Sequence, residues 1–317
     1  MAVTPATHQG GPGIQQSTEQ PTLSGRSPAR DLARLQSHLV VALVALVAIG
    51  GATRVMEAGL ACPDWPLCYG VLLPGRQMNL QVFLEWFHRL DAFAIGVALV
   101  ILAGVVIWKR RSLPRWSPAV GLLSLLLVCV QGALGALTVT QLLAAPLVTA
   151  HLATALLLVG LLSGSRQALL PRPATTKALP PWWRILCLLA LAGILVQALL
   201  GGAMASQWAA DRCLQLGESC LWLGSHRSVA TPVSLLACSL APASLALPAG
   251  HRSVQVLAFA VVPLIALQIA LGATAMSVRL SEPLITVGHQ IGAVLLVALL
   301  AAAASAAVQI HGEPTHG

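Results

Sequence analysis

Charged side chains are scarce in this sequence. Asp, Glu, Lys and Arg make up 9% of the 317 residues, whereas hydrophobic residues make up 57%. A soluble domain carries roughly 25% charged residues, so the scarcity excludes ordinary water-soluble enzymes, disordered chains and coiled coils. The 18 basic residues lie scattered between apolar runs rather than in one cluster, which argues against a nucleic-acid-binding domain. Such scattered charges are typical of the loops of a polytopic membrane protein in a lipid bilayer.

Long apolar runs are what the sequence has instead. A helix needs about 20 mostly apolar residues to cross about 30 Å of hydrocarbon, and eight runs meet this length. We therefore predict an all-α integral membrane protein with eight transmembrane helices. The expected spans are 36–54, 86–108, 117–139, 146–165, 183–205, 227–248, 254–278 and 284–309.

An even number of spans places both termini on one side of the membrane. Twelve of the Lys and Arg residues lie in the tails and connections on that side, and six lie on the other. The positive-inside rule therefore predicts cytoplasmic termini. The first apolar run begins too late for a cleaved signal peptide, so we expect none.

The two halves of the chain form an internal repeat. The matching landmarks are Gly50-Gly51-Ala52 with Gly201-Gly202-Ala203, the Gln131 to Ala136 element with the Gln268 to Ala273 element, His88 with His226, and His151 with His289. Each half holds four expected spans, so the two repeats keep the same orientation. This predicts two pseudo-symmetric four-helix bundles, in which small residues such as Gly50, Gly135, Gly201 and Gly272 let the helix backbones approach closely.

The predicted domains follow from the spans. Residues 1–35 are rich in Gly, Pro, Gln, Ser and Thr and are expected to form a disordered cytoplasmic tail. The N-terminal bundle covers 36–165 and the C-terminal bundle covers 183–309. A cytoplasmic linker over 166–182 joins them, and 310–317 form a second cytoplasmic tail.

Four histidines lie near the outer membrane surface, two in each half: His88, His151, His226 and His289. An ionisable side chain at that depth is costly and has a partner. Interhelical hydrogen bonds would satisfy it, but the pairwise repetition favours ligands. Two imidazoles on facing helices of a bundle suit a haem iron, whereas zinc requires three or four converging ligands. We therefore predict one haem-sized site in each half.

One acidic residue distinguishes the two predicted sites. Glu85 lies one helical turn before His88, and Leu223 stands at the matching place before His226. A carboxyl beside an apolar wall can move protons or stabilise developing positive charge. An ion pair with Arg89 is an equally good alternative. The asymmetry suggests that the first site performs chemistry and the second holds a permanent redox cofactor.

Four cysteines form two close pairs in the outer loops, Cys62 with Cys68 and Cys213 with Cys220. The outer side of a membrane is oxidising, so each pair can close as a disulfide. A staple that closes so short a loop is worth roughly 2–3 kcal/mol. A redox role for the cysteines is the alternative.

Together these motifs resemble the haem A synthase family over residues 36–308. The resemblance rests on Glu85-x-x-His88-Arg89, the loop Cys62-Pro63-Asp64-Trp65-Pro66-Leu67-Cys68, Gly50-Gly51-Ala52-Thr53-Arg54, the Gln131 element and His151. It implies an oxidoreductase that converts haem O to haem A. The C8 methyl is oxidised to a formyl group by successive hydroxylations.

The resemblance also implies roles for the singled-out residues. His88 and His151 would flank the iron of the substrate, haem O, with Glu85 as a catalytic neighbour. His226 and His289 would ligate the iron of a haem b cofactor. The loop cysteines match the disulfide-bearing bacterial type, which implies the bacterial plasma membrane. Implied partners are a haem O synthase, oxidase assembly factors and an electron donor that the sequence does not identify.

Two other classes of protein compete with this interpretation. A bis-histidine membrane cytochrome b that only carries electrons would explain four histidines, but not an acid in only one half. A transporter built from a parallel repeat would place polar residues near the bilayer midplane. The ionisable residues here gather near one surface instead.

Overall fold

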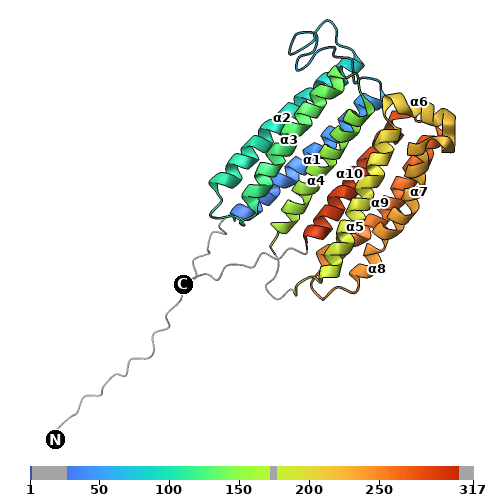
Figure 1. Ribbon diagram of the computed structural model, residues 1–317. Coiled ribbons are helices and arrows are strands. Elements are labelled where there is room, and N and C mark those ends of the chain that lie inside the picture. Colours follow the sequence, from blue (N-terminus) through green and yellow to red (C-terminus); the bar gives the residue numbers. More distant parts are fainter. Residues whose placement is uncertain (2–26, 172–176, 307–317) are drawn as a thin grey trace.

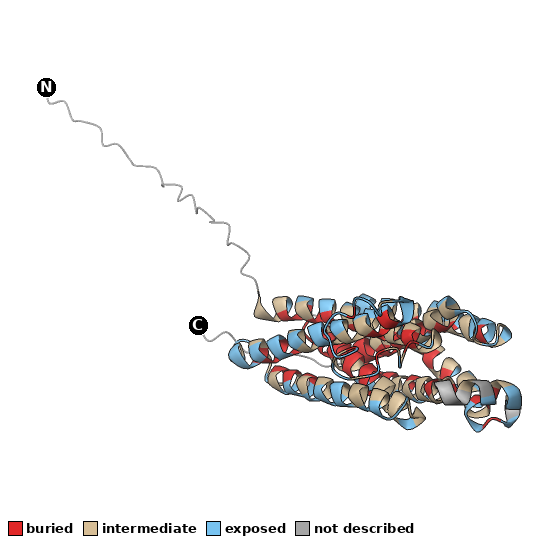
Figure 2. Ribbon diagram, turned by 90° about the horizontal axis from the view of Figure 1, so that it is seen from above, coloured by how far each residue is buried: buried red, intermediate tan, exposed pale blue. Residues whose placement is uncertain are grey.

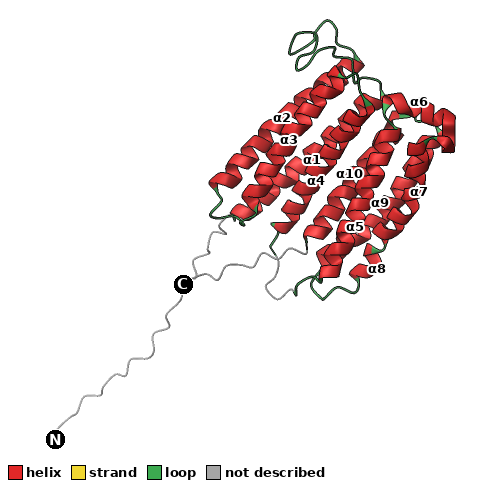
Figure 3. Ribbon diagram, viewed as in Figure 1, coloured by secondary structure: helices red, strands yellow, loops and turns green. Residues whose placement is uncertain are grey.

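All regular elements of the described chain are helices (Figure 3). The computed structural model describes residue 1 and residues 27–171 and 177–306. Within them, β-structure is limited to one isolated bridge between Cys68 and Val71. The predicted all-α class is therefore confirmed. Most of the expected N-terminal tail, five residues of the linker and the C-terminal tail lie outside the described residues.

The chain folds into ten α-helices and one short 3-10 helix in its described part. In chain order they are α1 (Pro28–Val55), α2 (Leu80–Trp108), α3 (Ser117–Thr140), α4 (Ala145–Ala168), α5 (Pro181–Met204), α6 (Gln207–Leu216), η1 (Gly217–Ser219), α7 (Leu221–Cys238), α8 (Leu240–Ser244), α9 (Arg252–Ser277) and α10 (Pro283–Ser305).

Seven helices are long and apolar enough to cross a membrane: α1, α2, α3, α4, α5, α9 and α10. Their outward faces expose many large apolar side chains, and the buried residues face the interior (Figure 2). The chain is therefore a multi-pass membrane protein. The expected sixth span is divided between α7 and α8, and α7 is not among the seven. Its first half is polar, since it carries Ser225, His226, Arg227 and Ser228.

Three helices, α1, α2 and α7, begin at least six residues earlier than hydrophobicity predicts. α1 begins at Pro28, so residues 28–35 are helical rather than part of a disordered tail. α2 begins at Leu80, six residues before the expected start at 86, because the Asn79 side chain caps it by accepting from Val82 N at 3.0 Å. His88 consequently lies two turns inside α2 rather than at its first turn.

The long helices pack in two groups that lie side by side (Figure 1). In the first group, α1 and α3 each contact both α2 and α4. In the second group, α5 and α9 each contact both α7 and α10. The groups meet where α10 packs against α4 and α1, and where α5 packs against α4. α4 and α10 therefore form the centre of the molecule.

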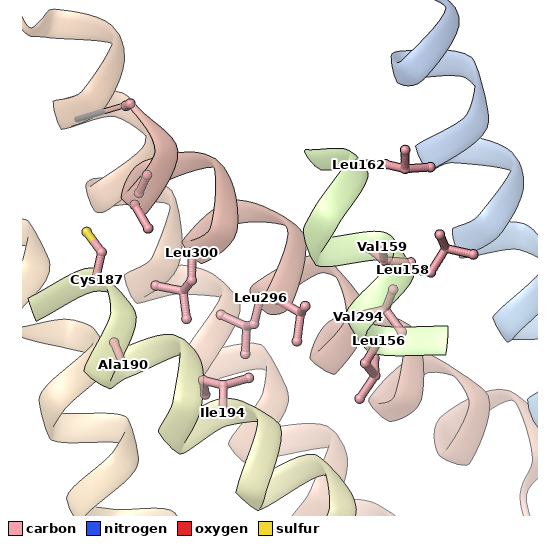
Figure 4. Close-up of a cluster of buried hydrophobic side chains, with 14 of the residues drawn as sticks. Leu156, Leu158, Val159, Leu162, Cys187, Ala190, Ile194, Val294, Leu296 and Leu300 are labelled. Carbon is pink, nitrogen blue, oxygen red and sulfur yellow. The ribbon is translucent and has the colours of Figure 1, made fainter. Parts of the chain in front are cut away.

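The central contact is tightly packed and apolar. Around it, Leu156, Leu158 and Leu162 of α4 and Leu296 and Leu300 of α10 are almost fully buried among α1, α4, α5 and α10 (Figure 4). Two glycines of α4 let α10 approach. A Cβ on Gly164 would lie 2.6 Å from Ser305 Oγ, and one on Gly160 would lie 3.5 Å from Val297 Cγ1. A larger residue at 164 would require the Ser305 hydroxyl to move and would crowd the Ala301 carbonyl of α10, 3.3 Å from the same Cβ.

Candidate functional site

A cavity of about 1250 Å³ lies within the first helix group. Ligand cavities of roughly 300–1,000 Å³ hold drug-sized molecules, so this one suits a large ligand. Its wall is mainly apolar, with side chains from α1 to α4, from the loop before α2 and from α10. The charged and histidine residues that line it are Arg54, Glu85, His88, Arg89 and His151.

The two histidines of the first half reach this cavity from α2 and α4. These helices lie across the first group from each other, because α1 and α3 separate them. The Nδ1 atoms of His88 and His151 are buried, and neither makes a hydrogen bond of ordinary geometry to a described residue. The backbone carbonyls of Leu46 and Gln131, which match Gln197 and Gln268 in the repeat, still interact with the His88 and His151 rings.

The two histidines of the second half lie close together and are held firmly. His226 of α7 and His289 of α10 have ring centroids 6.4 Å apart. Each ring places Nδ1 3.0 Å from a backbone carbonyl oxygen, that of Gln197 for His226 and that of Gln268 for His289. A carbonyl only accepts, so this contact is a hydrogen bond in the tautomer with the proton on Nδ1, and in that tautomer Nε2 keeps its lone pair for a ligand.

The same two glutamines also bind the histidine backbone. Gln197 Nε2 donates to the His226 carbonyl at 2.8 Å, and Gln268 Nε2 donates to the His289 carbonyl at 2.8 Å. We call this pair of glutamine contacts the clamp. In the repeat, Leu46 stands where the second half has Gln197, so α1 has no side-chain amide that could bind the His88 backbone in the same way. Gln197 was not predicted as a site residue, although the offset that relates Gly50 to Gly201 also aligns Leu46 with Gln197.

Each of the four rings lies against a glycine on a neighbouring helix. A Cβ on Gly50, Gly201 or Gly272 would lie 2.9 Å from Cε1 of the facing ring, and one on Gly135 would lie 3.4 Å away. The facing rings are those of His88, His226, His289 and His151, respectively. These glycines were predicted to let helix backbones approach closely. The structure shows that they also make room for the imidazoles.

Glu85 lies at the cavity wall and is only 4% exposed. Its carboxylate forms an ion pair with Arg89 and accepts from Cys62 N at 2.7 Å. Arg89 also donates to the carbonyls of Asp64 and Leu67, each at 2.6 Å. The ion pair that the sequence left as an alternative is therefore formed, and it holds the loop before α2 over the cavity.

Both expected disulfides are confirmed, Cys62–Cys68 and Cys213–Cys220. They close loops at the helix ends nearest the four histidines, which we call the disulfide end (Figure 1). In the first loop, Asp64 accepts from the amides of Gly70 and Tyr69 at 2.7 and 2.6 Å. These donors hold the pKa of the Asp64 carboxyl below its usual value.

Most of the chain matches a known protein family. The model described as COX15-CtaA, cytochrome oxidase assembly protein, matches residues 33–301. The chain belongs to the COX15-CtaA family. The matched range includes most of α1 and α10, the whole of the other five apolar helices, both disulfide loops and every residue of the candidate site. It agrees with the family resemblance drawn from the sequence motifs.

Several curated proteins similar to this COX15-CtaA chain are named heme A synthase, and one is named protoheme IX farnesyltransferase. A heme A synthase of Shewanella oneidensis is 33% identical over 201 residues, which cover 57% of the chain and 59% of that protein. A heme A synthase of Methylobacterium radiotolerans is 33% identical over 229 residues, 59% of the chain and 60% of that protein. A protoheme IX farnesyltransferase of Haloarcula marismortui is 33% identical over 113 residues, 36% of the chain and 23% of that protein. The chain thus spans at most about three fifths of these relatives in the matched regions.

Proposed function

We propose that this COX15-CtaA chain is a haem A synthase that oxidises the C8 methyl of haem O to a formyl group. The observation that carries the proposal is the contrast between its two histidine pairs. The first pair lines a large cavity beside Glu85, and the second is clamped at close range without an acid. A site for changing a substrate and a site for a permanent cofactor would differ in this way. The names of the relatives support the same activity.

The proposed architecture has eight spans in two pseudo-symmetric four-helix bundles. α7 and α8 together would form the remaining crossing, since they extend from Leu221 to Ser244. The repeated packing partners of the two helix groups support the symmetry. The distribution of basic residues supports cytoplasmic termini in a bacterial plasma membrane, with the disulfide end facing outward.

We assign a haem b cofactor to His226 and His289, whose geometry fits the group. An imidazole nitrogen lies about 2 Å from a bound metal ion, so two imidazoles on one metal would have ring centres about 6 Å apart. The observed separation is 6.4 Å. When bound, the haem would supply one-electron redox chemistry. Gln197 and Gln268 orient the two rings toward it with Nε2 unprotonated.

We assign haem O, the substrate, to the cavity between His88 and His151. The apolar wall excludes water and suits a large macrocycle with an apolar tail. Glu85 is fixed there by Arg89 and the Cys62 amide. We propose that its carboxylate accepts a proton or stabilises positive charge that develops at the reacting methyl. The likeness to a protoheme IX farnesyltransferase supports a haem O-forming enzyme as a partner.

Co-expression with an enzyme that supplies haem O tests the function. Chromatography of haems extracted from the membranes is expected to show haem A or its hydroxylated precursor. Membranes that contain the haem O source alone are the control. Haem O and haem b without either product would contradict the proposal and favour a cytochrome b that only carries electrons.

The substitution Gln197→Leu gives the second half the residue that the first half has at the matching position, Leu46. We expect the purified variant to hold its haem about tenfold more weakly, because a lost ligand-orienting partner typically costs 10- to 100-fold in affinity. Transfer of haem to apomyoglobin measures the loss. Gln255→Leu is the matched control, since Gln255 also donates to a backbone carbonyl, that of Ser244 at 3.2 Å. Equal haem retention in both variants would contradict the clamp.

A further inference from the structure

Arg54 has a charge that no described carboxylate balances. It lies in the last turn of α1, is half-buried and lines the cavity. Its Nη2 donates to Gln290 Oε1 at 3.3 Å, and no described Asp or Glu lies within ion-pair distance. A cation in a membrane-spanning segment is costly unless a partner satisfies it. Arg54 therefore lacks the partner that its location requires.

The other charged residues of the cavity wall cannot serve as that partner. Glu85 and Arg89 form an ion pair with each other, and Arg89 also donates to the loop carbonyls of Asp64 and Leu67. The charged lining residues then sum to one positive charge, at Arg54. A ligand that carries an acidic group would supply the opposite charge and a charge-assisted hydrogen bond.

Arg54 is also held in place at the junction of the two helix groups. Gln290 of α10 accepts from Arg54 and donates through Nε2 to the Val47 carbonyl of α1 at 3.2 Å. This fixes the guanidinium beside the cavity. In the repeat, Ala205 stands at the matching position of the second half. The second half therefore has no cation at the matching position. Arg54 lines the cavity and is also close enough to His289 of α10 to act on it electrostatically.

We propose that Arg54 binds a carboxylate of the ligand in the cavity, namely a propionate of the substrate porphyrin. This inference rests on the proposed function. A ferric porphyrin with two propionates carries a net negative charge, which complements the wall. The methyl proposed to react is next to a propionate on the porphyrin edge. Anchoring that propionate would therefore determine which methyl faces the catalytic residues, and Arg54 is a substrate-positioning residue.

Porphyrin titration of the purified full-length protein tests this assignment. The probes are ferric protoporphyrin IX and its dimethyl ester, and the Soret absorbance reports binding. We expect the unmodified protein to bind the free acid about tenfold more tightly than the ester, because hydrogen bonds between charged groups are strong. Arg54→Met is expected to bind both equally, and Arg54→Lys to keep most of the preference. The double variant His88→Ala and His151→Ala removes both cavity histidines. The part of the Soret change that is lost in this variant is the part that comes from porphyrin bound in the cavity.

Arg279→Met is the matched control, because Arg279 is exposed and does not line the cavity. Its preference for the free acid should equal that of the unmodified protein. If Arg54→Met retains the haem assigned to His226 and His289, the variant is folded. A full preference in Arg54→Met overturns the assignment, as does equal binding of acid and ester by an unmodified protein that makes haem A. A protein that binds no porphyrin in the cavity and makes no haem A overturns the proposed function as well.

Discussion

Replacing Glu85 with glutamine is expected to lower haem A formation by about 10²- to 10⁴-fold, the usual contribution of a proton-transfer group, while substrate remains bound. Glutamine has the shape of glutamate, and its amide oxygen can still accept from the Cys62 amide. The loop should therefore stay closed over the cavity. The negative charge is lost, and with it the ability to accept a proton or stabilise positive charge. The measurement is the amount of haem A, relative to the amount of this protein, in membranes that also contain an enzyme supplying haem O.

Glu57→Gln is the control for this substitution. Glu57 is exposed, lies just after α1 at the same end of the molecule and does not line the cavity. Its variant should make a normal amount of haem A. A normal yield from Glu85→Gln would remove Glu85 from the mechanism. Loss of bound haem O in that variant would show instead that the ion pair with Arg89 serves to hold the site together.

Replacing His226 with alanine is expected to remove nearly all haem b from the purified protein while the helical fold persists. The proposed iron site has two protein ligands, and a single imidazole on His289 cannot hold a low-spin haem alone. The pyridine haemochrome spectrum gives the ratio of haem to protein, and circular dichroism gives the helix content. An unchanged low-spin spectrum would contradict the ligand assignment.

His38→Ala is the matched control for the His226 variant. His38 is an exposed histidine in the first half of α1, whereas the first disulfide loop follows the other end of that helix. It should keep the normal haem content. Loss of haem in both variants, together with reduced helix content, would indicate general destabilisation rather than loss of a ligand.

Sequence alone predicts the helical membrane fold because apolar runs are a direct signal. The spans at 117–139 and 146–165 differ from α3 and α4 by at most three residues at each end. The family and both disulfide pairs were also predicted correctly. The repeat even placed the four histidines at one end of the molecule, because helices of the same direction carry them.

The rest depends on contacts that hydrophobicity does not encode. The early start of α1 comes from a polar turn that begins at Pro28, and that of α2 comes from the Asn79 cap. The pairing of Glu85 with Arg89 was one of two equal alternatives, since spacing shows only that both lie on one helix face. The lack of a carboxylate near Arg54 could not be predicted from the sequence. It becomes visible only when the positions of all described Asp and Glu side chains are known.

The close contact between α4 and α10 has a consequence for electron flow. α4 carries His151 and α10 carries His289, so each central helix contributes one imidazole to a different proposed haem. Gly160 and Gly164 let these helices meet without intervening side chains. If both proposed haems bind, the packing of these two helices would set the distance between them. A substitution that moved α4 away from α10 would then be expected to slow electron transfer between the haems, although it replaces none of the proposed ligands.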